Sequence, residues 1–321
     1  MPLSHAAAPE ASACSAASAR LGEPLAGTAP VAARWLAIEQ PGSWGARALA
    51  ESHFPRELGR ALGLKADAAG ARIALIRRPG QHAEHDPGAP RRIFLADTRP
   101  GRGALWSWST NDPATLLDLD FDIPGKPEHA APVLLVCTNS KRDACCAISG
   151  RALANWLAED AGTDSDAVWE SDHLGGHRFA PTAVVLPTGH VYGRLNGPAA
   201  RELLRDAAAG RVGGPLCRGR STWSRPGQAA DLALRAELQE YAADAVVVLG
   251  ERRLDPVPGD PAHAGSAAAA ERRHEVDLAC GEDRFTAVLA ESEAAEPRPE
   301  SCGKAFGTPL ELSLVSLKKH P

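Results

Sequence analysis

The sequence lacks any run of about 18 apolar residues, the length that a membrane-spanning helix requires. It also lacks an excess of positive charge, because 35 Lys and Arg stand against 40 Asp and Glu and give a net charge of -5. Its arginines are dispersed instead of forming a basic stripe. Residues 1–20 lack the basic opening and the apolar centre of a secretion signal. These absences predict a soluble cytoplasmic protein with no nucleic-acid partner and no membrane partner.

The cysteines are few and unevenly placed for a chain of this size. The 321 residues are enough for two or more domains with cores of their own, so disulfides are not needed for stability. There are seven cysteines, and three of them fall between positions 137 and 146. An odd number with one dense group favours reduced thiols that serve a metal, as in a cytoplasmic protein.

We expect four segments along the chain. They are a disordered tail over residues 1–21, an N-terminal α/β domain over 22–125, a second α/β domain over 126–215, and a C-terminal helix with a small β extension over 216–321. The boundary near residue 125 rests on a Pro-rich stretch, PGKPEHAAP. The fold class that follows is α/β.

Hydrophobic patterns predict the elements of each segment. In the first domain we expect strands over 31–38, 71–77 and 92–97, the last two as neighbours. In the second domain the predicted order is strand, helix, strand, hairpin and helix, over 133–137, 144–159, 168–169, 182–195 and 197–209. In the last segment we expect a helix over 228–243, a low-complexity linker over 256–270, and antiparallel strands over 274–278, 284–290 and 310–317.

Four metal-capable side chains fall at the ends of predicted strands in the second domain. Cys137 and Cys146 have eight residues between them, and His173 and His177 have three. Cys146 lies in the first turn of the helix predicted over 144–159, where the helix dipole favours a thiolate. The two glycines between the histidines predict a loop that lets both rings turn inward. We therefore predict one site with two thiolate and two imidazole ligands.

The ligand types alone leave the occupant of this site open. Two cysteines and two histidines suit tetrahedral zinc, a [2Fe–2S] cluster, or no metal at all. Zinc fingers usually have two to four residues between their cysteines. The eight residues found here form a wider loop, which favours the larger iron–sulfur cluster.

Three stretches, CTNSKRDACC, HLGGHRFAPTAVVLPTGHVYGR and WLAIEQPGSWG, resemble the bacterial sucrase/ferredoxin-like family. The resemblance implies a thioredoxin-like [2Fe–2S] ferredoxin domain over 126–215. It further implies that Cys137 and Cys146 hold one iron and that His173 and His177 hold the other, as in fungal relatives. These motifs give no support to a sucrase activity. Asn139 departs from the His that we expect in many relatives, although it is not a ligand there.

The implied function is proton-coupled one-electron transfer between redox protein partners. Imidazole ligands make the oxidised cluster less negative than an all-Cys cluster and leave one ring nitrogen free to exchange a proton. We therefore expect an electron carrier and not an enzyme with its own substrate. Two alternatives remain, a thiol oxidoreductase that uses Cys145 and Cys146, and a zinc-stabilised binding module.

The remaining candidates have simpler interpretations. Cys145 is expected to be a small buried residue, with ligation or a vicinal dithiol as alternatives. Arg178 and Arg194 either face an acidic partner or form internal ion pairs. His190 is expected to be solvated. Four further cysteines look isolated in the sequence and are expected to have structural roles or none: Cys14, Cys217, Cys280 and Cys302.

Overall fold

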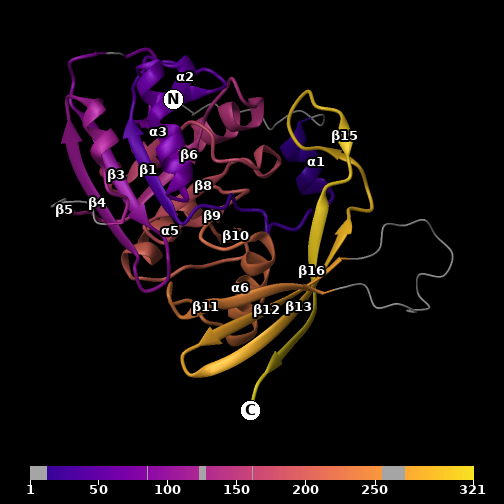
Figure 1. Ribbon diagram of the computed structural model, residues 1–321. Helices are drawn as coiled ribbons and strands as arrows, with labels where there is room; N and C mark the ends of the chain where they lie inside the picture. The colour runs from indigo at the N-terminus through magenta and orange to yellow at the C-terminus, as the bar shows by residue number, and fades with distance from the viewer. Residues whose placement is uncertain (1–12, 85, 123–127, 161, 255–271) are drawn as a thin grey trace.

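The computed structural model describes residues 13–84, 86–122, 128–160, 162–254 and 272–321. A ten-stranded sheet, a four-stranded sheet, a two-stranded sheet and the helices packed on them form this part of the molecule (Figure 1). The helices are α1 (Cys14–Arg20), α2 (Ala48–Glu51), α3 (Arg56–Ala68), α4 (Arg151–Glu159), α5 (Gly197–Ala208) and α6 (Arg225–Leu238). Short 3₁₀ turns occupy Pro113–Asp118, Ser165–Ala167 and His177–Phe179, and a π-helical turn occupies Cys146–Gly150.

The large sheet is mixed and has ten strands, in the order β10-β9-β8-β6-β7-β2-β1-β3-β4-β5. Its strands are β1 (Arg34–Glu39), β2 (Ala71–Arg77), β3 (Arg91–Asp97), β4 (Ala104–Thr110), β5 (Glu128–His129), β6 (Val133–Cys137), β7 (Val168–Ser171), β8 (Ala183–Leu186), β9 (His190–Tyr192) and β10 (Cys217–Arg220). Strand β2 pairs with β7 at Ile76 and Ser171. The strands on both sides of the predicted boundary near residue 125 therefore lie in one sheet, and the division into domains stays a prediction.

Strand β6 is buried on both faces, which explains its unbroken run of apolar residues. Leu134 and Val136 pack into a core with α4 and α5. The alternate residues Leu135 and Cys137 point to the opposite face and join a second core, to which α1 contributes Cys14. Cys137 thus faces the N-terminal segment of the chain and not helix α4.

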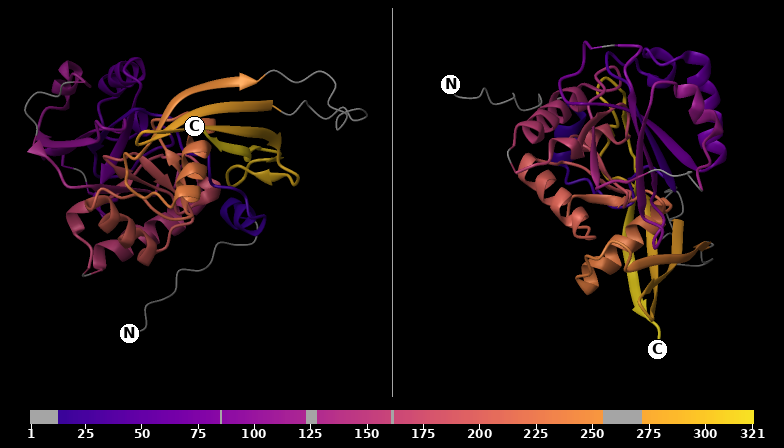
Figure 2. Two further views of the ribbon diagram at one scale, coloured as in Figure 1. Left: turned by 90° about the horizontal axis from the view of Figure 1, so that it is seen from below. Right: turned by 90° about the vertical axis from the view of Figure 1, so that its left-hand side faces the viewer.

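The small sheet is antiparallel and lies against α6 (Figure 2). Its strands, in sheet order, are β11 (Val246–Leu254), β12 (Arg272–Cys280), β13 (Asp283–Glu293) and β16 (Leu310–Lys319). A two-stranded hairpin of β14 (Arg298–Pro299) and β15 (Phe306–Gly307) extends from it, and α1 lies beside this hairpin (Figure 1). The first described helix and a hairpin near the end of the chain therefore lie side by side.

These observations confirm the predicted fold class, an α/β molecule with a small C-terminal sheet. The predicted order of strand, helix, strand, hairpin and helix is present from β6 to α5. Local signals set the ends of these elements, since the side chain of Asn196 caps α5 by accepting a hydrogen bond from the Ala199 N–H.

Two expectations need correction. Strands β2 and β3 are not neighbours, because β1 lies between them, parallel to β2 and antiparallel to β3. Within the tail expected to be disordered, Cys14–Arg20 form helix α1, which buries Cys14 and Ala17. Small residues such as Ala, Ser and Cys give a weak signal for a buried helix, because they carry little hydrophobic area. Residues 1–12 and the predicted linker at 256–270 lie outside the described residues.

Candidate metal centre

Two loops leave the large sheet at the same edge, and they carry the four predicted ligands. Strands β6 and β7 are parallel neighbours, and Cys137 lies opposite Ser171 in their register. The loop toward Cys146 starts directly after β6, and the loop with both histidines starts directly after β7. Because parallel strands end at the same edge of a sheet, these loops must lie side by side.

Gly150 brings Cys146 back to Cys137. The chain after β6 turns into the π-helical turn Cys146–Gly150, which passes close to the end of the strand. A Cβ atom at Gly150 would lie 2.0 Å from the carbonyl oxygen of Cys137. Only glycine permits this approach, and the thiols of Cys137 and Cys146 are close enough to shift each other's pKa in opposite directions. A glycine inside a helical pattern, ISGRAL, was the sequence signal for this contact.

The histidine loop folds over the two thiols. Gly175 and Gly176 have left-handed φ angles of +83° and +75°, so the chain reverses between the two imidazoles. The rings of His173 and His177 stack with their centroids 4.7 Å apart. The Nδ1 atom of His177 lies 3.3 Å from the Sγ atom of Cys146.

Two arginines hold the histidine loop by its carbonyl groups. Arg72 of β2 donates to the carbonyl of His173 at 2.7 Å, and Arg218 of β10 donates to the carbonyl of Gly175 at 3.0 Å. Arg218 is only 1% exposed, and burial lowers the pKa of its guanidinium to about 9, so it stays protonated at neutral pH. The loop is thus fixed by two side chains from strands distant in sequence.

At Cys137 and His177 the protonation states suit metal ligation, whereas hydrogen bonding to Cys137 and burial raise the pKa of the Cys146 thiol well above its usual range, so that thiol must lose its proton to a metal. The pKa of the Cys137 thiol lies well below its usual range, because hydrogen bonds from Cys146, His173 and the backbone N–H of Leu174 outweigh the effect of burial. Burial lowers the pKa of His177, which keeps its imidazole neutral. Metals bind thiolates and neutral imidazoles, so Cys137 and His177 are in the protonation states that metal binding requires.

The surroundings also leave donor atoms available for a metal. The Nδ1 atom of His173 is buried and has no hydrogen-bond partner among the residues that the structure describes. The ligand atoms of Asp143, Cys146 and His177 all lie within 4.8 Å of one another. This Cys/Asp/His group could bind a metal ion. Which residues act as ligands stays a prediction, and Asp143 is not among the four predicted ligands.

The other candidate residues have clear positions. Arg178 forms an ion pair with Glu23 at 2.7 Å, and Arg194 donates to Ser18 Oγ at 2.9 Å, so both make internal contacts. His190 is completely buried, which makes the expectation of a solvated ring wrong. Strand β9 lies between β8 and β10, and this burial is a property of the sheet order, not of the local sequence.

The adjacent cysteines 145 and 146 belong to different groups. The Sγ atom of Cys145 lies 3.6 Å from Cys14 and 3.3 Å from Cys302, whereas Cys146 contacts His177 and Cys137. Cys145 is buried, as expected. Cys14 and Cys302 are not isolated, contrary to the sequence-based expectation, because the fold brings them together from opposite ends of the chain.

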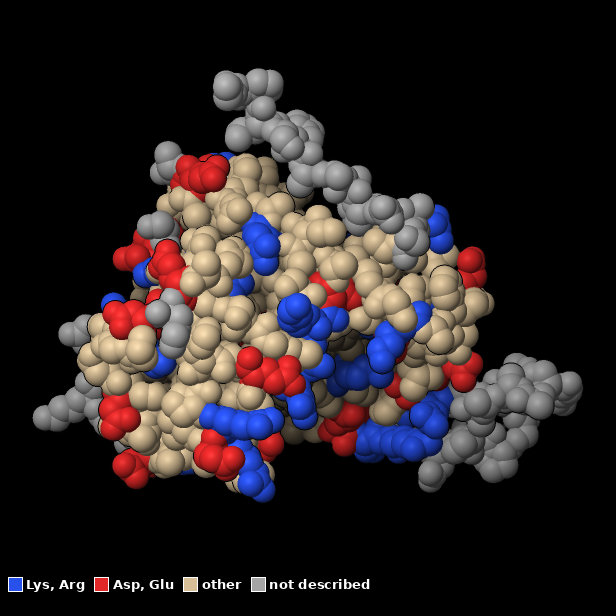
Figure 3. Space-filling model, turned by 90° about the horizontal axis from the view of Figure 1, so that it is seen from above, with Lys and Arg blue, Asp and Glu red and all other residues tan. Residues whose placement is uncertain are grey.

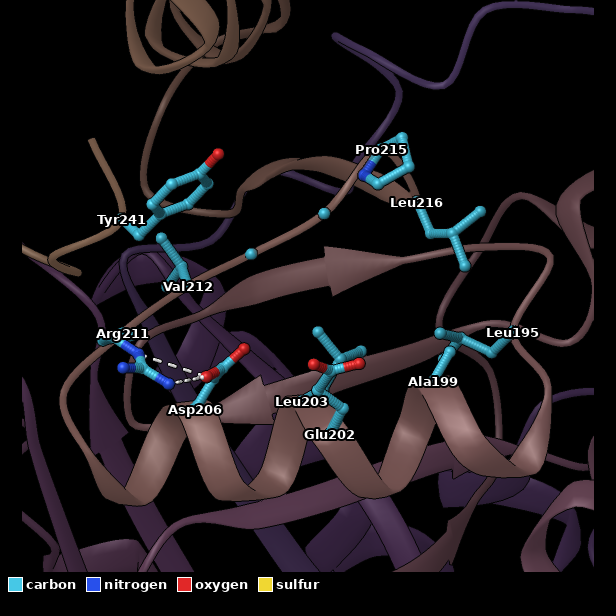
Figure 4. Close-up of a pocket in the computed structure, with 12 residues that line it drawn as sticks. Leu195, Ala199, Glu202, Leu203, Asp206, Arg211, Val212, Pro215, Leu216 and Tyr241 are labelled. Atoms are coloured by element: carbon cyan, nitrogen blue, oxygen red, sulfur yellow. Dashed lines mark hydrogen bonds and ion pairs between the residues drawn. The ribbon is translucent and has the colours of Figure 1, made fainter. Parts of the chain in front are cut away.

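A pocket of about 440 Å³ lies elsewhere, between α5 and residues 211–216 (Figure 4). It contains the ion pair of Arg211 with Asp206, and its apolar lining includes Leu203 of α5, Leu216 and Tyr241. No Cys or His lines it. The pocket therefore has none of the chemistry that the two loops provide.

Basic side chains gather on one face of the molecule. Seen from above, Lys and Arg gather around a hollow near the centre of this face, and several Asp and Glu lie next to them (Figure 3). Lys141 and Arg142, in the loop between the two predicted cysteine ligands, are both exposed. Local positive charge thus exists on a chain whose net charge is -5.

The family model of sucrase/ferredoxin-like proteins matches residues 25–219, which is more than half of the 321-residue chain. The chain belongs to the sucrase/ferredoxin-like family. The sucrase/ferredoxin-like region includes all four predicted ligands and both arginines that hold the histidine loop, and it leaves out α1 and the small sheet. No curated protein and no solved structure matches the chain at a significant level. None of the helices in the described residues combines the length and the apolar character needed to cross a membrane.

Proposed function

We propose that this protein is a cytoplasmic electron carrier with a [2Fe–2S] cluster held by Cys137, Cys146, His173 and His177. The observation that carries the proposal is the meeting of two thiols and two imidazoles on loops from adjacent parallel strands. Membership of the sucrase/ferredoxin-like family supports the proposal. Among the three occupants that the ligand types allow, the wide loop between the cysteines favours the cluster.

When bound, such a cluster supplies one-electron redox chemistry, and comparable His2Cys2 centres have potentials of about -150 to +300 mV, against about -400 mV for plant-type clusters. The protein side contributes a buried positive charge, since Arg218 donates to the loop between the histidines. This charge favours the more negative, reduced state. We therefore expect a potential above that of plant-type ferredoxins.

The histidines would couple electron transfer to protons. Each imidazole binds through one nitrogen and can hold a proton on the other. On His173 and on His177, the ring nitrogen that does not bind the cluster would have this role. We expect the midpoint potential to fall as the pH rises from about 6 to about 10, a range around the ordinary imidazole pKa and its shifts. A midpoint that is constant over this range would contradict proton coupling.

The partners would be redox proteins. The basic side chains around the hollow in Figure 3 would match an acidic surface on such a partner. Association should then slow as salt is added, because screening weakens long-range attraction between exposed charges.

The decisive experiment is anaerobic purification followed by iron and sulfide analysis, absorption spectra and paramagnetic resonance of the dithionite-reduced protein. We expect two iron atoms per chain. Cys137→Ala should lose the iron, and His173→Cys should keep it at a lower potential. Cys217→Ala is the matched control, because Cys217 is buried in β10 and belongs to neither thiol group. A colourless protein with zinc and no iron would refute the cluster.

A zinc-stabilised binding module is the second candidate. It is favoured by the compact group of Asp143, Cys146 and His177, which would fit a single ion. The thiol oxidoreductase alternative has less support, because the thiols of Cys145 and Cys146 contact different partners. Metal analysis separates the carrier from the binding module directly.

A further inference from the structure

Three thiols from distant parts of the chain meet beside the candidate metal centre. Cys14 begins α1, Cys145 precedes the π-helical turn, and Cys302 follows β14. Their Sγ atoms form a nearly equilateral triangle, with distances of 3.6 Å (Cys14 to Cys145), 3.3 Å (Cys145 to Cys302) and 3.6 Å (Cys302 to Cys14). We call this group, together with Asp143, the three-thiol site.

A disulfide does not account for this arrangement. An S–S bond is about 2.05 Å long and would use two sulfurs, which leaves the third thiol without a bond. A tetrahedral zinc ion with Zn–S bonds of about 2.3 Å separates its sulfur ligands by about 3.8 Å. The observed triangle is close to this size, and a metal ion would engage all three sulfurs equally.

Asp143 supplies a fourth ligand atom. Its carboxylate oxygens lie 3.7 and 3.6 Å from the Sγ atom of Cys14, and the four ligand atoms all lie within 4.8 Å of one another. The carboxylate accepts hydrogen bonds from the Cys145 N–H at 2.8 Å, the Ser301 hydroxyl at 2.7 Å and the Cys302 N–H at 2.7 Å. A carboxylate has about four acceptor positions, so one remains for a metal.

Most of the three-thiol site is shielded from solvent, as expected for a structural metal site. Cys14 and Cys145 are 0% and 2% exposed, and Asp143 is 3% exposed. Hydrogen bonding with Cys14, and to a lesser extent with the backbone N–H of Ser15, lowers the pKa of the Cys145 thiol. Backbone donors of this kind orient metal-bound thiolates and offset part of their charge.

We propose that the three-thiol site binds a zinc ion that is separate from the cluster ligands. Three thiolates exclude the hard cations Mg²⁺ and Ca²⁺, and a carboxylate oxygen is a poor ligand for Cu(I). The ion fastens α1 and the loop after β14 to the segment that carries Cys146. Since α1 contacts the turn His177–Phe179, this ion keeps α1 packed against the histidine loop.

Metal analysis of a variant series tests the proposal. Protein is produced with iron and zinc in the medium and purified anaerobically, and both metals are counted per chain. The wild type should hold one zinc ion in addition to its iron. Cys302→Ser should lose at least nine-tenths of the zinc and keep the iron, whereas Cys137→Ala should lose the iron and keep the zinc. Cys280→Ser, at the end of β12 in the small sheet, is the matched control and should keep both.

The result is independent of the proposed function, because iron and zinc are counted in the same sample. Zinc absent from the wild type, or unchanged in Cys302→Ser, would overturn the three-thiol site. So would a disulfide between Cys145 and Cys302, which mass spectrometry of the anaerobically alkylated protein would reveal.

A second measurement tests the proposal even if the Cys302→Ser variant does not fold. The Cys137→Ala, Cys146→Ala double variant keeps the three-thiol site and lacks both thiols of the candidate metal centre. Titration with Co²⁺ should produce thiolate-to-cobalt charge-transfer absorption that saturates at one ion per chain and disappears when Zn²⁺ is added. Absence of that absorption would refute the proposal.

Discussion

Replacing Glu23 by Gln is expected to destabilise the protein strongly at neutral pH. The Glu23 carboxylate is almost completely buried and forms ion pairs with Arg178 at 2.7 Å and with Arg298 at 2.9 Å. Arg178 follows His177 directly, and Arg298 lies in β14. One carboxylate therefore connects the histidine loop to the C-terminal hairpin.

The structure sets the size of this effect. Breaking a buried ion pair by removing one partner costs about 3 to 5 kcal/mol, because the remaining charge stays buried. Gln keeps one oxygen acceptor, Arg178 is 15% exposed, and Arg298 still contacts Glu311. These compensations favour the lower end, about 3 kcal/mol. With a urea dependence of about 3 kcal/mol per molar, the unfolding midpoint should fall by about 1 M.

The effect should depend on pH with a definite sign. Burial alone would raise the pKa of Glu23, but the hydrogen bonds from Arg298 and Arg178 outweigh it and hold the pKa below the ordinary value of 4.5. The carboxylate thus stabilises the fold fully above pH 4.5. This stabilisation is lost as the pH falls through the lower pKa of the folded state, where wild type and variant should become similar.

Urea unfolding followed by tryptophan fluorescence at several pH values is the assay. Glu51→Gln is the control, because Glu51 pairs with Arg47 at the surface, and it should leave the midpoint unchanged. Equal midpoints for wild type and Glu23→Gln at pH 7 would refute the reasoning. A difference that stays constant below pH 4.5 would show that the charge of Glu23 is not its cause.

Two glycine substitutions test how the loops are positioned. Gly176→Ala should cost about 3 kcal/mol and reduce iron content, because its Cβ would lie 2.3 Å from the Arg218 guanidinium at a φ of +75°. Gly175→Ala, with a φ of +83° but open space, should cost only about 1 kcal/mol. Gly150→Ala should lower stability by about 3 kcal/mol and release iron, since its Cβ would meet the last carbonyl of β6 at 2.0 Å. Gly63→Ala, in an open position of α3, should instead stabilise the protein by about 0.5 to 1 kcal/mol. Urea unfolding and metal analysis would compare Gly176→Ala with Gly175→Ala, and Gly150→Ala with Gly63→Ala. Equal effects within either pair would show that the close contacts at Gly176 or Gly150 do not matter.

Local sequence was sufficient to predict the elements around the candidate centre. The run VLLVC predicted β6, and the Asn-Gly-Pro sequence predicted the start of α5, because strand burial and helix capping depend on neighbouring residues. The four predicted ligands could also be named in advance, since each pair lies within one loop. The cysteine pair and the histidine pair lie next to each other because β6 and β7 are parallel neighbours, an arrangement that a predicted strand–helix–strand unit implies.

Contacts between distant segments could not be predicted in this way. Arg72 and Arg218 hold the histidine loop only because β2 and β10 lie in the same sheet as β6. The burial of His190 likewise follows from the position of β9 between two strands.

The sequence by itself was sufficient to predict four metal ligands near β6 and the class of fold that presents them, because these predictions depend on residue type and on short spacings. Only the tertiary structure decided that Cys14 and Cys302 join Cys145, since 131 and 157 residues separate these partners from it. No local pattern records a contact between the two ends of a chain. It arises when α1 and the C-terminal hairpin pack on the same face of the large sheet as the Cys137 side chain.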